Sequence, residues 1–340
     1  MTEKFELGRS GLEVFPLGFG GIPIQRVSEE KAVEVVREAV NQGVNFIDSA
    51  RAYGDSEEKI GKALQGVDEE VYLASKTPAK SAEKAFDDVQ KSLDNFRVDC
   101  IELYQLHNVS SREDYQAQVT DENSALAGLK KARQEGLIEH IGITGHSGDL
   151  LLRAIEEYEF ATIQFCYNFI EREAEDELIP SARSLDLGLI AMKPLAGGRL
   201  RRADISLKYI FNRKNIIPIP GMETVAEVRE NAGILEPDPE LKAADYDFIA
   251  ERRQELGDQF CRRCGYCLPC PEEINIPVVL RVESFLNRMP AGDIKEGPYE
   301  TFLEAKNCTE CYQCVDDCPY DLPIPRLLQE NMNLAVEELE

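Results

Sequence analysis

The chain has 340 residues, 43% hydrophobic and 30% charged, a composition typical of a folded protein with room for one large and one small domain. Its formal net charge of −25 argues against nucleic acid and anionic membranes as general partners. The sequence has no run of about 18 apolar residues and no apolar leader, so it predicts a cytoplasmic protein without a membrane span.

Short β-branched runs alternate with amphipathic stretches over the first 235 residues. The stretch 28–43 starts at a serine and ends at a glycine, which are typical helix boundaries. Stretches 81–96 and 241–256 have the same helical spacing. The predicted strands are 15–21, 44–50, 71–76, 100–107, 139–145, 161–168, 188–194 and 216–221.

Eight strands that alternate with helices over about 220 residues predict an α/β fold, a (β/α)8 TIM barrel. A doubly wound open sheet is the alternative, but that fold usually carries a glycine-rich phosphate fingerprint after its first strand. The segment "LGFGGIPI" lacks this spacing. Residues 4–15 read as a hairpin that closes the bottom of the barrel. We expect two domains, the barrel at 1–240 and a small, mainly helical domain at 241–340 that carries two four-cysteine motifs.

Polar residues occur where three successive predicted strands end. Asp48, Lys76 and His107 end strands two, three and four, and Tyr53 lies five residues beyond Asp48. The carboxyl ends of barrel strands form the active face, so these side chains should meet. A lysine cation beside a tyrosine favours the phenolate, and an aspartate would hold that lysine. The set predicts proton donation to a carbonyl oxygen, which the imidazole would orient.

Eight cysteines lie close together near the C-terminus. Their spacing is that of bacterial ferredoxins, with a last gap one residue shorter in the first motif. It predicts two [4Fe–4S] clusters, with structural zinc as the alternative. The fourth cysteine of each motif ligates the other cluster in two-cluster ferredoxins. One cluster is therefore assigned to Cys261, Cys264, Cys267 and Cys318, and the other to Cys308, Cys311, Cys314 and Cys270.

Several motifs resemble the aldo/keto reductases, in the branch with a C-terminal ferredoxin-like domain. They are "FIDSARAYGDSE", "ASK", "YQLH", "GITGHS", "AMKPLAGG", "IPGMETVAEVRENA" and "CGYCLPCP". The resemblance implies hydride transfer to an aldehyde or ketone. It makes Tyr53 the general acid/base, with Lys76 and Asp48 tuning it and His107 positioning the carbonyl.

The same resemblance places nucleotide contacts after the later strands. Glu227 stands where an arginine often grips the 2′-phosphate, and Met192 replaces the tyrosine that stacks on the nicotinamide. We therefore expect NADH to be favoured over NADPH, with a flavin as the alternative cofactor. The expected cofactor contacts are Thr144, Gln164, Met192, Lys193, Gly221, Glu227 and Asn231.

The combination predicts an iron–sulfur oxidoreductase that acts on a small carbonyl substrate and relays electrons through its clusters. The alternatives are an electron carrier with a non-catalytic barrel, a flavin-dependent reductase that uses the barrel rim, and clusters that only stabilise their domain. Arginines around the first cysteine motif predict a basic patch that receives a ferredoxin or flavodoxin. They are Arg252, Arg253, Arg262 and Arg263.

Overall fold

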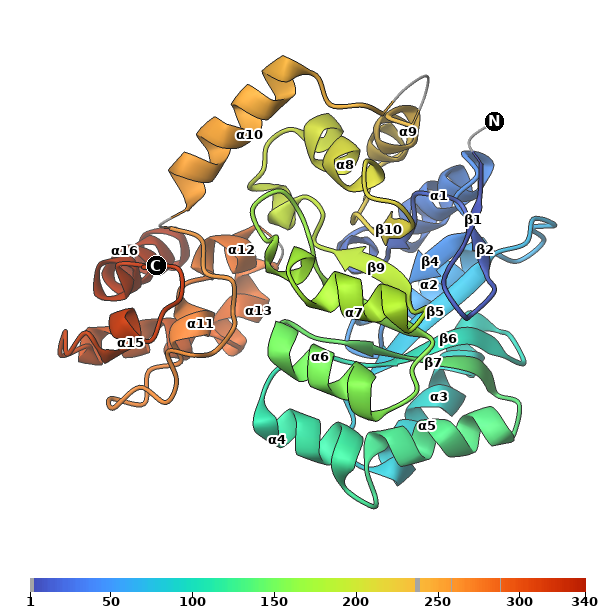
Figure 1. Ribbon diagram of the computed structural model, residues 1–340, viewed down its shortest axis with the longest axis horizontal. Helices are drawn as coiled ribbons and strands as arrows, with labels where there is room; N and C mark the ends of the chain where they lie inside the picture. Colours follow the sequence, from blue (N-terminus) through green and yellow to red (C-terminus); the bar gives the residue numbers. More distant parts are fainter. Residues whose placement is uncertain (1–2, 236–238, 258, 288) are drawn as a thin grey trace. The chain divides into compact units, whose positions relative to one another are not determined.

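Eight parallel strands pair in sequence order and form the sheet of the N-terminal part of the chain (Figure 1). The first and last strands also meet, since Gly18 N donates to Pro218 O and Gly20 N to Pro220 O, each at 2.9 Å. These bonds close the sheet into the expected (β/α)8 barrel, and the open-sheet alternative is wrong. The strands are β3 (Phe19–Gly20), β4 (Phe46–Asp48), β5 (Tyr72–Thr77), β6 (Ile101–Leu106), β7 (Ile138–Thr144), β8 (Thr162–Cys166), β9 (Gly188–Met192) and β10 (Ile216–Pro218).

The computed structural model describes residues 3–235, 239–257, 259–287 and 289–340. These form two units, Met1–Tyr246 and Asp247–Glu340. Within them, no helix is both long enough and apolar enough to cross a membrane.

Helices follow the barrel strands with the caps that the sequence indicates. The Ser28 side chain accepts from Lys31 N at 3.4 Å and begins α1, and Gly43, with a φ of 93°, follows its end. The helices of this part are α1 (Glu29–Asn41), α2 (Ser56–Ala63), α3 (Ala82–Phe96), α4 (Arg112–Tyr115), α5 (Ala125–Gln134), α6 (Gly148–Glu157), α7 (Leu178–Ser184), α8 (Ala203–Phe211), α9 (Val225–Gly233) and α10 (Ala243–Leu256), which runs into the second unit.

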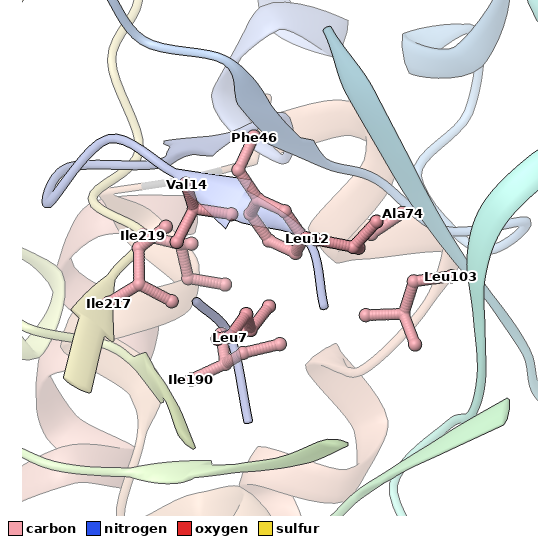
Figure 2. Packing of buried hydrophobic residues seen from close by; sticks show 9 residues of the cluster. All are labelled: Leu7, Leu12, Val14, Phe46, Ala74, Leu103, Ile190, Ile217 and Ile219. Carbon is pink, nitrogen blue, oxygen red and sulfur yellow. The ribbon is translucent and has the colours of Figure 1, made fainter. Parts of the chain in front are cut away.

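An N-terminal hairpin, β1 (Phe5–Glu6) and β2 (Glu13–Val14), closes one end of the barrel. Its Gly8 bridges to Leu187, directly before β9, so the hairpin covers the amino-terminal ends of the strands. Figure 2 shows its apolar side chains packed among inward-facing strand residues. The nine labelled residues are Leu7, Leu12, Val14, Phe46, Ala74, Leu103, Ile190, Ile217 and Ile219. The opposite rim is therefore the open face.

The second unit contains short helices, and none of its described residues lies in a β-strand. Residues 276–289 follow a helical pattern in the sequence and contain two helices, α11 (Ile276–Val279) and α12 (Val282–Leu286), and Arg288 in this stretch lies outside the described residues. The cysteine loops pack on an apolar core around α16. The helices are α11 (Ile276–Val279), α12 (Val282–Leu286), α13 (Ala291–Glu296), α14 (Tyr299–Leu303), α15 (Gln313–Asp316) and α16 (Ile324–Leu339).

Candidate active site and cluster-binding cavities

The four polar residues predicted at the strand ends meet on the open rim of the barrel. The Lys76 Nζ lies 2.6 Å from Asp48 Oδ2 and 4.9 Å from the centre of the Tyr53 ring. The rings of Tyr53 and His107 meet edge to face, with their centres 5.7 Å apart. A phenol, an ammonium, a carboxylate and an imidazole thus share one site.

The Lys76–Asp48 pair is fully enclosed, with side chains 1% and 3% exposed. Lys76 Nζ also donates to Ser49 O at 2.5 Å, and Gln105 Nε2 donates to Asp48 Oδ1 at 3.1 Å. Burial lowers the pKa of Lys76, but the charges of Asp48 and Tyr53 and hydrogen bonds with both outweigh it and raise that pKa above its usual value. Lys76 therefore remains an ammonium next to the phenol of Tyr53.

His107 follows β6 directly and carries no charge at neutral pH. Burial, followed by the positive charges of Lys76 and Lys193, lowers its pKa to about 3. A neutral imidazole has one donor and one acceptor nitrogen, so it can hydrogen-bond a carbonyl oxygen without competing for the proton.

A buried carboxylate, Glu57, anchors the loop that carries Tyr53. It pairs with Arg51 of the same loop. It also accepts from Ser75 Oγ at 2.5 Å, from Ser92 Oγ at 2.7 Å and from Asn95 Nδ2 at 3.0 Å, so it ties α2 to β5 and α3. Sequence reasoning missed this residue because an acidic residue in the first turn of a helix is usually solvated.

Two of the expected nicotinamide contacts are buried on the rim. Thr144 Oγ1 accepts from Asn108 N at 2.9 Å, so it holds the loop after β6. Gln164, on β8, hydrogen-bonds Asp48, and its Oε1 has no protein partner among the described residues. A buried, unpartnered acceptor fits a carboxamide N–H of a bound nicotinamide.

The other expected rim contacts, Met192 and Lys193, stand at the carboxyl end of β9. Met192 is the last residue of that strand and is half-buried. Lys193 follows it, and its Nζ lies 2.7 Å from His146 Nε2. The structure therefore brings both residues to the face that carries Tyr53.

The segment after β10 uses its acidic residues internally. Glu227 forms a capping box with Thr224, and its carboxylate accepts from the backbone N–H of Glu223 at 2.8 Å and of Thr224 at 3.0 Å. Arg229 points to Glu38, with 2.8 Å between Nε and Oε1. The amino end of α9 is therefore already occupied by a carboxylate.

The remaining expected contacts in this segment are Asn231, on α9, and Gly221, three residues after β10. Asn231 is 3% exposed. A Cβ on Gly221 would lie 2.5 Å from Pro23 Cγ, so only glycine fits there without movement.

Of the four arginines of the expected basic patch, Arg252 is buried and the other three, Arg253, Arg262 and Arg263, are half-buried. The Arg252 side chain is only 9% exposed and pairs with Glu255. Arg262 stacks 3.9 Å above the centre of the Tyr320 ring, and Arg263 is half-buried. These side chains serve contacts within the unit, which residue spacing alone does not reveal.

Cysteines of both motifs border two cavities in the second unit. Each has an open volume of a few hundred Å³, about 310 Å³ for the first and about 420 Å³ for the second. The cysteines of the first are Cys261, Cys264, Cys267 and Cys318. Those of the second are Cys267, Cys270, Cys308, Cys311 and Cys314. Four thiols or more around each space fit the ligand set of a [4Fe–4S] cluster.

Two thiols of these cavities, Cys267 and Cys314, are weaker acids than an ordinary cysteine in the protein alone. Burial, followed by neighbouring cysteines, raises the pKa of Cys267 to about 12 and that of Cys314 to about 11. Only the thiolate ligates metal, so iron has to displace these protons when it binds. Among the described residues, no three His, Cys, Asp or Glu side chains converge on a single-ion site.

Comparison with known proteins assigns both parts of the chain. Residues 16–206 match the aldo/keto reductase family, and residues 260–323 match a 4Fe-4S dicluster domain. The L-galactose dehydrogenase of Arabidopsis thaliana is 29% identical over 213 residues, which cover 57% of this chain and 66% of that enzyme.

Two solved structures show the barrel fold. An aldo-keto reductase of Bacillus halodurans in its holo form has a TM-score of 0.64 and 22% identity, over 74% of this chain and 96% of its own. An aldo-keto reductase of Klebsiella pneumoniae in complex with NADPH has a TM-score of 0.61 and 21% identity, over 75% of this chain and 95% of its own.

We predict that His107 stays neutral from pH 8 to about pH 4, since its pKa is about 3. Lys193→Met removes one of the two cations that disfavour the imidazolium, so the pKa of His107 should rise. NMR titration of the imidazole measures the pKa of His107 in the wild type and in the variant, and Lys31→Met, at an exposed position of α1, is the control. A wild-type His107 that titrates near 6.5 would contradict the prediction.

Proposed function

The chain belongs to the aldo/keto reductase family, and from this premise we propose that it reduces an aldehyde or ketone, or oxidises the alcohol, with Tyr53 as the general acid/base. It is an oxidoreductase of this type with a 4Fe-4S dicluster domain. The observation that carries the proposal is the enclosed Lys76–Asp48 pair next to Tyr53 and the neutral His107.

In the proposed mechanism Tyr53 donates its hydroxyl proton to the carbonyl oxygen as that oxygen gains negative charge. Lys76 stabilises the phenolate that remains, and Asp48 keeps the ammonium in place. The N–H of neutral His107 hydrogen-bonds the same oxygen and orients the carbonyl. In the oxidation direction, the phenolate accepts the alcohol proton.

A nicotinamide is the proposed cofactor of the barrel, and when bound it would supply the hydride. Gln164 would hold its carboxamide through the unpartnered Oε1. Glu227 puts a carboxylate at the amino end of α9, where the family binds the adenosine 2′-phosphate, while Glu223 pairs with Arg26 and Glu38 pairs with Arg229. A unit charge pair at 4 Å is worth about 1–4 kcal/mol near a surface, so NADPH should be disfavoured.

Two [4Fe–4S] clusters are the proposed cofactors of the second unit, where they would store and transfer single electrons. The cysteines that line the two cavities support the crossed assignment, with Cys318 beside the first motif and Cys270 beside the second. A ferredoxin or flavodoxin as the electron partner stays a prediction. We also place the protein in the cytoplasm, where clustered thiols remain reduced.

Purified under anaerobic conditions, the protein should contain about eight iron and eight labile sulfide per chain, from two four-iron clusters. Metal analysis and a sulfide assay measure this ratio. Stoichiometric zinc in place of iron would refute the cluster proposal. Half the expected iron would mean that only one of the two cavities holds a cluster.

Tyr53→Phe should lower carbonyl reduction about 10²–10⁴-fold, because it removes the proton donor and keeps the ring. Steady-state rates with small aldehydes and ketones measure the loss, and the iron content of the variant is the control. An equal rate in the variant would contradict the proposed role. A wild type that turns over no carbonyl would favour an electron carrier with a non-catalytic barrel.

NADH should bind the anaerobic protein at least about tenfold more tightly than NADPH, which corresponds to about 1.4 kcal/mol of the expected repulsion. Calorimetric titration with both nucleotides measures the ratio of their dissociation constants, and Glu223→Gln should bring that ratio closer to one. Tighter binding of NADPH would overturn the electrostatic argument. An extracted flavin would instead identify the alternative cofactor of the rim.

A further inference from the structure

A second polar group lies on the rim beside the four residues of the proposed mechanism. Lys193 follows β9, His146 lies two residues after β7, and Asn108 lies two residues after β6. Lys193 Nζ is 2.7 Å from His146 Nε2, and His146 Nδ1 is 2.7 Å from Asn108 Oδ1. When Lys193 donates to His146 Nε2, the ring proton of His146 is on Nδ1, and this N–H donates a hydrogen bond to Asn108 Oδ1.

The backbone holds this group in place. Lys193 and Asn108 adopt left-handed conformations, with φ of 57° and 61°, which side-chain-bearing residues seldom adopt. Asn168 Nδ2 donates to Lys193 O at 3.1 Å, and Ser110 Oγ accepts from His146 N at 2.9 Å. Such strained positions persist where surrounding contacts fix them, and they concentrate at binding and catalytic sites.

The charge of Lys193 reaches the carbonyl-binding position. Asn108 directly follows His107 and is joined through His146 to Lys193, so a second ammonium lies near the imidazole in addition to the one paired with Asp48. The positive charge of Lys193 also contributes to the lowered pKa of His107. The chain as a whole carries a net charge of −25 and repels anions at long range. Lys193 is a local cation in spite of this net charge, and its place on the rim allows it to bind an anionic group next to the carbonyl.

We propose that Lys193, held by His146, binds the carboxylate of the substrate, so that the substrate is a 2-oxo acid or the corresponding 2-hydroxy acid. This inference rests on the proposed carbonyl chemistry at Tyr53. His107 contacts the Tyr53 ring, and its neighbour Asn108 is joined to Lys193 through His146, so the carbonyl oxygen and the carboxylate bind on neighbouring groups. An ammonium that donates to a carboxylate discriminates strongly against a neutral group in the same place.

Binding is tested with oxamate, a 2-oxo acid analogue that cannot be reduced at a ketone, against neutral oxamide. Calorimetry on the full-length holoprotein should show oxamate binding about 10–100-fold tighter than oxamide. Lys193→Met should remove that preference, Lys193→Arg should keep most of it, and Lys31→Met should not change it. Equal affinities in the wild type, or a preference that survives Lys193→Met, would overturn the inference.

Turnover separates this inference from the proposed function. The ratio of kcat/KM for a 2-oxo acid to that for its amide should fall about 10–100-fold in Lys193→Met, mostly through KM. An unchanged ratio with weaker NADH binding would overturn the inference and assign Lys193 to the cofactor phosphates. If oxamate binds through Lys193 while no carbonyl is turned over, the anion site stands and the reductase proposal fails.

Discussion

The buried ion pair between Lys76 and Asp48 is the interaction on which the rim depends. Removing two charges from water costs several kcal/mol per ion, so the pair needs its additional hydrogen bonds from Gln105 and to Ser49 O. It fixes an ammonium next to Tyr53, and that ammonium helps to keep His107 neutral. The proposed proton donation by Tyr53 and the proposed orientation of the carbonyl by His107 both depend on this one pair of strand-end residues.

Much of the fold could be predicted from the sequence because parallel barrel strands are buried on both faces and read as apolar runs. Phe46–Asp48 and Ile101–Leu106 lie within predicted strands, and α1 begins directly after the predicted serine cap. The barrel then places every strand end on one rim, so Asp48, Lys76 and His107 could be predicted to meet.

The rest of the site could not be predicted because it depends on contacts between side chains far apart in the sequence. Nothing in residue spacing pairs Lys193 with His146, 47 residues away, or turns Glu57 inward to four donors. Arg252 was expected in a basic patch, but its side chain is 9% exposed and pairs with Glu255. Composition shows which charges exist, and only the fold shows which of them are already paired.

The central claim is that one chain joins two-electron carbonyl chemistry at Tyr53 to single-electron storage in two clusters. The most direct measurement mixes the dithionite-reduced, desalted protein anaerobically with one equivalent of NAD⁺ and the carbonyl compound that it turns over best, while the visible absorbance of the clusters is followed. Reduction of one carbonyl takes two electrons and two protons, so with NAD⁺ present as the hydride carrier we expect both clusters to be reoxidised and one alcohol to form per chain. Alcohol formed from NADH at the full rate while the clusters stay unchanged would contradict this account.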